Sequence, residues 1–162
     1  IEGRVSDMIN RGGLKVFPEE VAEVIRLSPE VAECAVAGIP DDRLGEVPWA
    51  FVVTRDGAAL DEASLTALCR EHLAPYKVPA RFVLLDALPH VREIFGDGTQ
   101  VMLITVDEHT VAPLRLSARI VTSESVPDAR ARRDAFYRAW WLGVPAEIDD
   151  VLSFGLIWPR GT

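Results

Sequence analysis

Two apolar runs rich in β-branched residues, residues 31–39 and 47–54, constrain the fold of this chain more than any other feature. Turn-forming residues bound them: a Pro-Asp-Asp sequence at 40–42 follows the first run, and Asp56-Gly57 follows the second. Runs of this length and composition, ended by turn signals, are typical of buried strands. They therefore predict the centre of a small β-sheet that other elements must cover.

Helical patterns flank these predicted strands. Pro18 and the two glutamates after it open a helix that Pro29 ends, because proline suits the first helical position and cannot continue a helix. Asp61 is a typical N-cap for a second helix, whose predicted face is Leu65, Leu68, Cys69 and His72. Residues 81–85 predict a third strand. The order of these elements predicts a small α/β domain, a short sheet with flanking helices.

The pattern changes after Leu88-Pro89. Residues 95–98 form a turn signal, and residues 101–106 and 114–120 predict a β-hairpin whose buried positions are Leu114, Leu116, Ala118 and Ile120. A helix is expected from Pro127 to about Leu142, and residues 148–158 fit a helix or a strand equally well. The whole chain is therefore expected to be α+β: an α/β domain followed by a hairpin-plus-helix extension.

The predicted helix in the extension carries several aromatic residues. Phe136, Trp140 and Val144 recur at helical spacing, and Tyr137 and Trp141 lie beside them. Such a face is too broad and too apolar to stay in water, so it must pack against another surface, of this chain, of a ligand or of a partner. Three uses remain open: a core against the hairpin, a pocket for an acyl or aromatic ligand, and docking on a partner, with a homo-oligomer among the candidates.

Composition narrows the class of protein. A formal net charge of −8 argues against a nucleic-acid partner. The sequence contains no apolar stretch long enough for a membrane span, and its start lacks the pattern of a secretory signal. Two cysteines, Cys34 and Cys69, are too few for a disulfide framework and favour a reducing compartment, so a cytoplasmic location is expected.

Three groups of residues, in a fixed order, carry a resemblance to a known family. The first is Gly3-Arg4-x-x-Asp7 with Asn10-x-Gly12-Gly13. The second is Pro18-Glu19-Glu20-Val21, followed by Pro29-x-Val31, Val36-x-Gly38-Ile39-Pro40-Asp41 and Gly45-Glu46, and the third is Tyr76-Lys77-Val78-Pro79, leading to Leu88-Pro89. Through them, residues 3–89 resemble the C-terminal lid domain of the adenylate-forming superfamily, in its acyl-CoA synthetase branch.

The resemblance implies roles for individual residues. It puts the hinge between the two catalytic poses of the lid at Ser6, where Asp or Lys is usual, with Asp7 next to it. It puts Arg4 near the nucleotide phosphates, and Gly12 and Gly13 in the loop that approaches the pantetheine arm of CoA. The alternatives are a surface ion pair for Arg4 and an ordinary tight turn for the glycines. Gly45-Glu46 is expected to be a structural turn.

The resemblance also implies partners and cofactors for a complete enzyme. These are an N-terminal adenylation core domain, the acyl substrate, and ATP, Mg²⁺ and CoA. No phosphate-binding loop of the Gly-rich, lysine-ended kind occurs in this sequence, so the chain alone is expected to be inactive.

One departure from the family pattern affects the mechanism. The family has Leu-Pro, four or five residues, and then Gly-Lys, whose lysine stabilises carboxylate and phosphate oxygens during adenylation. Here Asp97 follows Gly96, and no lysine occurs after Lys77, which is itself expected to be solvated. Arg92 could replace the lysine only if its loop folded back. No catalytic residue is therefore assigned.

The sequence predicts two parts: a lid domain at 1–89 and an unrecognised α+β extension at 90–162. The extension fits a natural addition, a fusion or a shifted reading frame. His90 and His109 are candidate ligands or bases, but no metal-binding spacing accompanies them.

Two functions follow from the sequence: the lid of an ATP-dependent acyl-CoA ligase, or a non-catalytic binding or interaction module that keeps the lid fold.

Overall fold

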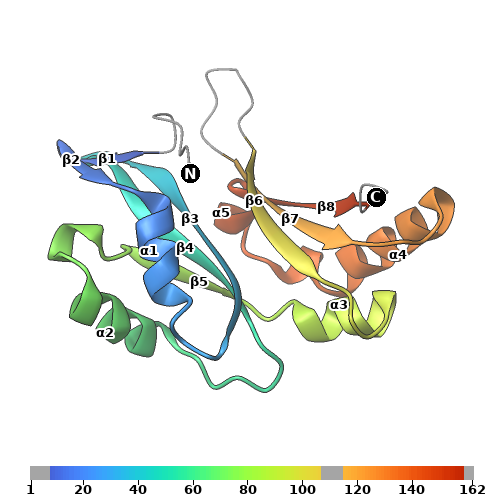
Figure 1. Ribbon diagram of the computed structural model, residues 1–162. Helices are drawn as coiled ribbons and strands as arrows, with labels where there is room; N and C mark the ends of the chain where they lie inside the picture. The colour runs from blue at the N-terminus through green and yellow to red at the C-terminus, as the bar shows by residue number, and fades with distance from the viewer. Residues whose placement is uncertain (1–7, 107–114, 159–162) are drawn as a thin grey trace.

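The computed structural model describes residues 8–106 and 115–158, which form two sheets with their helices (Figure 1). The first sheet has five strands: β1 (Ile9–Arg11), β2 (Leu14–Val16), β3 (Val31–Asp41), β4 (Gly45–Thr54) and β5 (Arg81–Leu85). Two helices, α1 (Pro18–Ile25) and α2 (Glu62–His72), and a 3-10 turn, η2 (Pro75–Lys77), accompany it. The predicted α/β domain is therefore confirmed.

Strand β4 is the centre of the first sheet. It pairs with β3 in antiparallel register from Thr54 to Gly45 and with β5 in parallel register, while the β1–β2 hairpin joins its first residue. All but one of its side chains from Val47 onward are buried. Because alternate side chains of a strand point to opposite faces, both faces of β4 must be covered.

Different elements cover the two faces of this sheet. On one face, Cys34, Val36 and Val52 pack against α1 and α2, whose buried residues include Ile25 and Leu65. Asp61 begins α2 as predicted, since its carboxylate accepts a hydrogen bond of 2.7 Å from the Ser64 amide. The expected helix face is only partly buried, because His72 is exposed.

The extension covers the other face. Helix α3 (Leu88–Phe95) leads into a three-stranded sheet of β6 (Val101–Val106), β7 (Arg115–Val121) and β8 (Leu152–Ile157). Between β7 and β8 lie α4 (Val126–Ala139), the 3-10 turn η3 (Trp141–Gly143) and α5 (Ala146–Asp149). One continuous cluster joins Phe51, Val53 and Val83 of the first sheet to Val91 and Leu116 of the extension.

The structure decides the open points in the second half of the chain. Strands β6 and β7 are antiparallel, with Val101 opposite Ile120 as a hairpin requires, and Leu116, Ala118 and Ile120 are buried. The connection and Leu114 lie outside the described residues. The last segment contains both element types, α5 and then β8, which runs parallel to β7. Parallel pairing explains the crossover through α4.

Helix α3 was not predicted, and it crosses the proposed boundary at residue 89. Its signal is present in the sequence: Pro89 stands in the first turn, and Leu88, Val91 and Phe95 recur at helical spacing and are buried. Gly96, with φ of 97°, ends the helix. The turn predicted at 95–98 therefore begins at Gly96, one residue later than predicted.

The aromatic helix differs from its prediction in where it ends. Regular α4 stops at Ala139, and Trp140 leaves helical geometry with φ −130° and ψ −49°. The next residues tighten into a 3-10 turn because Pro145 cannot continue a helix and disfavours helical geometry at the residue before it. As a result Phe136 and Trp141 are buried, Trp140 is half-buried, and Tyr137 is 46% exposed. Including Tyr137 in the covered face was wrong.

Candidate functional site

The Gly12–Gly13 turn joins β1 to β2 at one edge of the first sheet. Both glycines have left-handed backbone geometry, with φ of 59° and 87°, which residues with side chains rarely adopt. The Gly12 amide donates to the Leu44 carbonyl at 2.7 Å. A Cβ on Gly12 would lie 3.1 Å from a Leu44 methyl carbon, whereas one on Gly13 would meet nothing within 4 Å. At Gly12 the backbone is therefore packed against the loop before β4, whereas at Gly13 the side on which a Cβ would point is open.

Side-chain hydrogen bonds hold this turn and the loop next to it. The Asn10 carboxamide oxygen accepts a hydrogen bond of 2.9 Å from the Gly13 amide, and the Asn10 amide donates to Glu46 at 3.0 Å. In the adjacent loop the Asp41 carboxylate accepts from the amides of Leu44 and Arg43, which holds its pKa below the ordinary value. Gly45, with φ of 78°, and Glu46 begin β4 directly after the turn at 42–44, so the turn expected at Gly45-Glu46 lies just before them.

Two cations connect the hairpin and α1 to the η2 segment. The Arg11 guanidinium donates to the carbonyls of Tyr76 and Val78 at 2.9 and 3.0 Å. The Lys77 ammonium lies 2.6 and 2.8 Å from the two Glu20 oxygens, and this pairing raises the pKa of the lysine. The Lys77 side chain is only 19% exposed, so the expectation of a solvated lysine was wrong.

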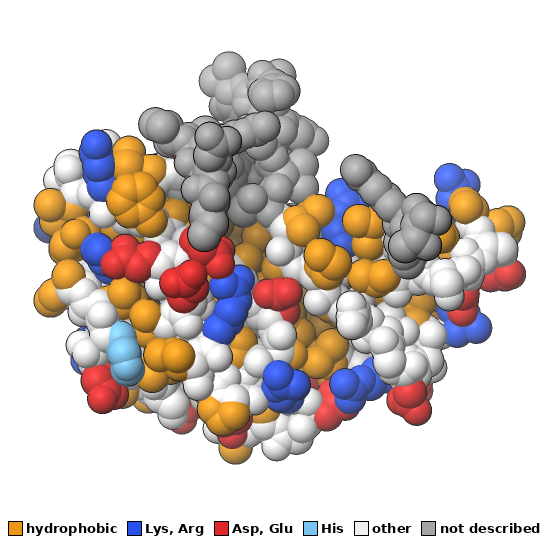
Figure 2. All heavy atoms as spheres, viewed as in Figure 1, with side chains coloured by type: hydrophobic (Ala, Val, Ile, Leu, Met, Phe, Trp, Pro, Cys, Tyr) orange, Lys and Arg blue, Asp and Glu red, His pale blue; other side chains and the backbone are white. Residues whose placement is uncertain are grey.

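Exposed apolar side chains belong to the segments next to the turn. Leu14, Phe17 and Leu44 are all exposed, although they stand next to well-packed elements. Figure 2 shows hydrophobic side chains over this end of the domain, near the β1–β2 hairpin of Figure 1. An open glycine backbone beside exposed apolar side chains suits a ligand that passes close to the main chain.

Several predicted site residues cannot be placed. Arg4, Ser6, Asp7 and His109 lie outside the described residues. Among the predicted site residues, the structure describes Gly12 and Gly13. Asn10, Arg11 and the η2 segment lie next to them and also belong to the candidate site. Sequence reasoning assigned no role to Arg11, although its position directly before the two glycines was a usable signal.

The segment that replaces the family lysine lies at the other end of β4. Gly96 and Asp97 form an exposed turn, in which the Gly96 carbonyl accepts from the Thr99 hydroxyl at 2.9 Å. Arg92 extends from α3 and pairs with Asp56, two residues after the end of β4. The Gly12–Gly13 turn contacts the first residues of β4, so the ten residues of that strand, about 30 Å, separate the two places.

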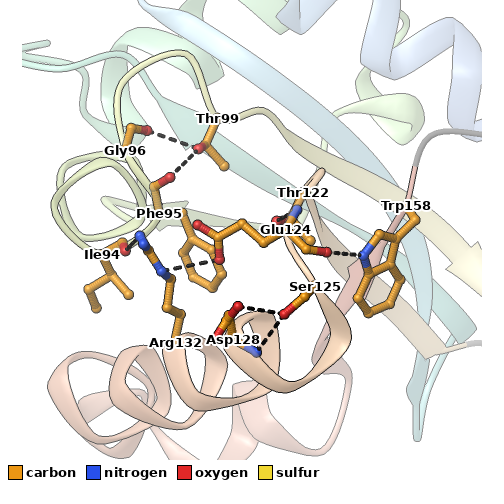
Figure 3. Close-up of polar contacts among 10 residues, drawn as sticks. All are labelled: Ile94, Phe95, Gly96, Thr99, Thr122, Glu124, Ser125, Asp128, Arg132 and Trp158. Atoms are coloured by element: carbon orange, nitrogen blue, oxygen red, sulfur yellow. Dashed lines mark hydrogen bonds and ion pairs between the residues drawn. The ribbon is translucent and has the colours of Figure 1, made fainter.

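Within the extension, polar contacts join α4 and the segment before it to the end of α3 (Figure 3). The Arg132 guanidinium of α4 donates to the Ile94 carbonyl at 2.5 Å and pairs with Glu124 at 3.1 Å. The Trp158 indole donates to the Glu124 carbonyl at 2.9 Å. A salt bridge joins the first sheet to the extension: Arg81 of β5 pairs with Glu147 of α5 at 2.7 Å, and the same guanidinium lies over the Trp49 ring.

Other candidate chemistry is not supported by the placement of side chains. Within residues 8–106 and 115–158, no three His, Cys, Asp or Glu side chains are grouped to hold a metal ion. His90 lies beside the Trp140 ring, with centroids 6.5 Å apart. Among the helices described, none is long and apolar enough to cross a bilayer. Cys34 and Cys69 are free, and burial raises their pKa to about 12 and about 11.

Comparison with known proteins identifies the first half of the chain. Residues 20–93 match the family described as AMP-binding enzyme C-terminal domain. The first half of this chain is a C-terminal lid domain of the adenylate-forming superfamily. A 2-succinylbenzoate–CoA ligase of Geobacillus kaustophilus is 50% identical over 86 residues, which cover 53% of this chain and 18% of that protein. The chain thus spans under one fifth of that relative.

A solved structure and a longer alignment extend the comparison. A fatty acyl CoA synthetase of Mycobacterium tuberculosis has a TM-score of 0.50 and 37% identity, covering 53% of this chain and 17% of that one. A naringenin synthase of Pestalotiopsis fici is 39% identical over 125 residues, covering 76% of this chain and 4% of that protein. An alignment of that length must continue beyond residue 93, so its similarity includes part of the extension.

Proposed function

We propose that this chain is the lid of an ATP-dependent acyl-CoA ligase, which joins a carboxylic acid to CoA through an acyl-adenylate. The observation that carries the proposal is the Gly12–Gly13 turn, whose backbone is left open at Gly13. Relatives that share this domain are CoA ligases. The complete protein would need an N-terminal core domain, the acyl substrate, ATP and Mg²⁺.

The two half-reactions make different demands on such a lid. In the first, a carboxylate attacks the α-phosphorus of ATP and pyrophosphate leaves; in the second, the CoA thiol attacks the acyl carbon and AMP leaves. Magnesium bound with ATP would neutralise phosphate charge in the first step. The open turn serves the second step, because the pantetheine arm can pass a glycine backbone more closely than a side chain allows.

The first half-reaction lacks its expected cation. Asp97 would repel a phosphate where a lysine would attract it, and Arg92 is paired with Asp56. We therefore propose that the chain alone forms no acyl-adenylate. In the complete protein, Arg4 would lie near the nucleotide phosphates and Ser6-Asp7 would form the hinge.

The proposed lid function predicts CoA binding at the open turn. A Gly13→Ala variant puts a side chain in a left-handed position, as does the matched control Gly57→Ala, whose φ is 71° and whose surroundings are equally open. Both variants should lose similar stability, about 1–2 kcal/mol. Isothermal titration of the chain with CoA should show binding that Gly13→Ala weakens and Gly57→Ala leaves unchanged.

The rival function, a non-catalytic module that keeps the lid fold, makes the opposite prediction. In that case neither CoA nor ATP binds the wild-type chain. Self-association through α4 and η3 would use the exposed Tyr137 and Leu142, because Phe136 and Trp141 are already buried within the chain. The free thiols fit a protein of a reducing compartment, and we propose the cytoplasm.

A further inference from the structure

The hairpin that carries the Gly12–Gly13 turn is anchored at its base by the buried Ile9 and Val16, but it has little ladder pairing with its sheet. Strand β1 pairs with β4 at one position only, Arg11 opposite Gly45. Glycine backbone is intrinsically soft, because it accepts left-handed and right-handed conformations about equally. The Gly13–Asn10 and Gly12–Leu44 hydrogen bonds hold part of this turn, and further contacts from outside it restrict the two adjacent glycines to one conformation.

Arg11 supplies such contacts. One guanidinium nitrogen donates to two carbonyls of the η2 segment, Tyr76 at 2.9 Å and Val78 at 3.0 Å, and these bonds are partly buried. Hydrogen bonds from a charged donor in partly buried surroundings are stronger than neutral ones exposed to water. They join residues 65 and 67 positions apart in the chain.

The acceptor segment is itself held from the other side. Lys77, between the two accepting residues, pairs with Glu20 of α1. The carbonyls of Tyr76 and Val78 are therefore fixed relative to α1. Because the Arg11 guanidinium binds these carbonyls, Arg11, which directly precedes Gly12, is also held relative to α1. The arrangement connects the hairpin and α1, which follow one another in the chain, to η2, which lies far along the sequence.

We propose that Arg11 is a positioning residue that holds the Gly12–Gly13 turn in the conformation that receives CoA. The ligand in this statement rests on the proposed function, whereas the positioning itself rests on the contacts of Arg11. A turn held in advance loses less conformational entropy when a ligand binds, so its affinity for that ligand is higher.

The test compares variants of the full chain that differ in the donor. Arg11→Met keeps the length of the side chain and removes the charge and both bonds, and Arg11→Lys keeps the charge and some donor capacity. Arg70→Met, on the exposed side of α2, is the control for loss of one positive charge. Amide hydrogen exchange of each ¹⁵N-labelled protein is followed by NMR, and CoA affinity is measured by titration.

Exchange at the Gly12 and Gly13 amides should rise about tenfold or more in Arg11→Met, the range expected for loss of bonds from a charged donor. CoA affinity should fall by a similar factor, Arg11→Lys should recover part of both effects, and Arg70→Met should change neither. Unchanged exchange in Arg11→Met, or an equal rise at Leu65 and Cys69 of α2, would overturn the positioning role. A wild-type chain that binds no CoA would instead overturn the proposed function.

Discussion

At the scale of single residues, burial and local charge decide which groups are chemically available. Cys34 and Cys69 lie in the core between the first sheet and its helices, and desolvation of the thiolate raises their pKa to about 12 and about 11. Thiolate is the reactive form, so both side chains should be inert in the native protein.

This predicts that neither thiol is alkylated by iodoacetamide in the native chain at pH 8, since that pH lies well below both raised pKa values. The fully unfolded chain should react at both positions, and mass spectrometry of digested protein distinguishes the two. Rapid labelling of Cys34 or Cys69 without denaturant would show that the core around them is open.

At the scale of elements, the end of α4 determines which aromatic rings support the core. Phe136 is 1% exposed and packs on Trp140 and Phe154, with centroids 5.4 and 5.0 Å apart. Trp141 is also buried, and its indole donates to Asp149 at 2.8 Å. The half-buried Trp140 contributes less than its place in the sequence pattern suggests.

Phe136→Ala should therefore lower the free energy of unfolding by about 3–5 kcal/mol, as for other large buried aromatic residues. Tyr137→Ala, one position further along the same helix and 46% exposed, is the matched control and should cost well under 1 kcal/mol. Denaturant melts measure both values, and light scattering reports self-association. Equal losses for the two variants would mean that α4 faces the core differently.

At the scale of the whole molecule, the extension completes the core of the lid. Phe51, Val53, Val83 and Leu85 are nearly inaccessible, and the residues that cover this face include Val91, Leu116 and Phe136 of the extension. Without residues after 86, one face of the sheet would become an exposed apolar patch. The lid and the extension are therefore expected to unfold together.

A chain that ends at Asp86 should bind a hydrophobic dye and lose its cooperative thermal transition. The full chain should show one sharp transition and bind little dye. A truncated chain that melts cooperatively and excludes the dye would show that residues 1–86 form an independent domain and that the extension only lies on its surface.

Much of this architecture could be predicted from local signals. The runs at 31–39 and 47–54, the Asp61 cap and the hairpin at 101–120 each follow from periodicity and turn chemistry. Helix α3 was missed because its apolar positions lie in a short segment beside an apparent boundary. The pairing of Lys77 with Glu20 and the contacts of Arg11 join residues more than fifty positions apart, and no local pattern contains that information.

We propose that this lid keeps a turn that receives CoA and lacks the cation that adenylation needs. The most direct measurement joins all 162 residues to the core of the Geobacillus ligase in place of its own C-terminal domain, and assays the half-reactions separately. We expect the chimera to form thioester from supplied acyl-adenylate, an activity lost in Gly13→Ala and kept in Gly57→Ala. Its ATP–pyrophosphate exchange should be no higher than that of the core alone. Exchange well above that level, or a folded chimera that forms no thioester, would contradict this proposal.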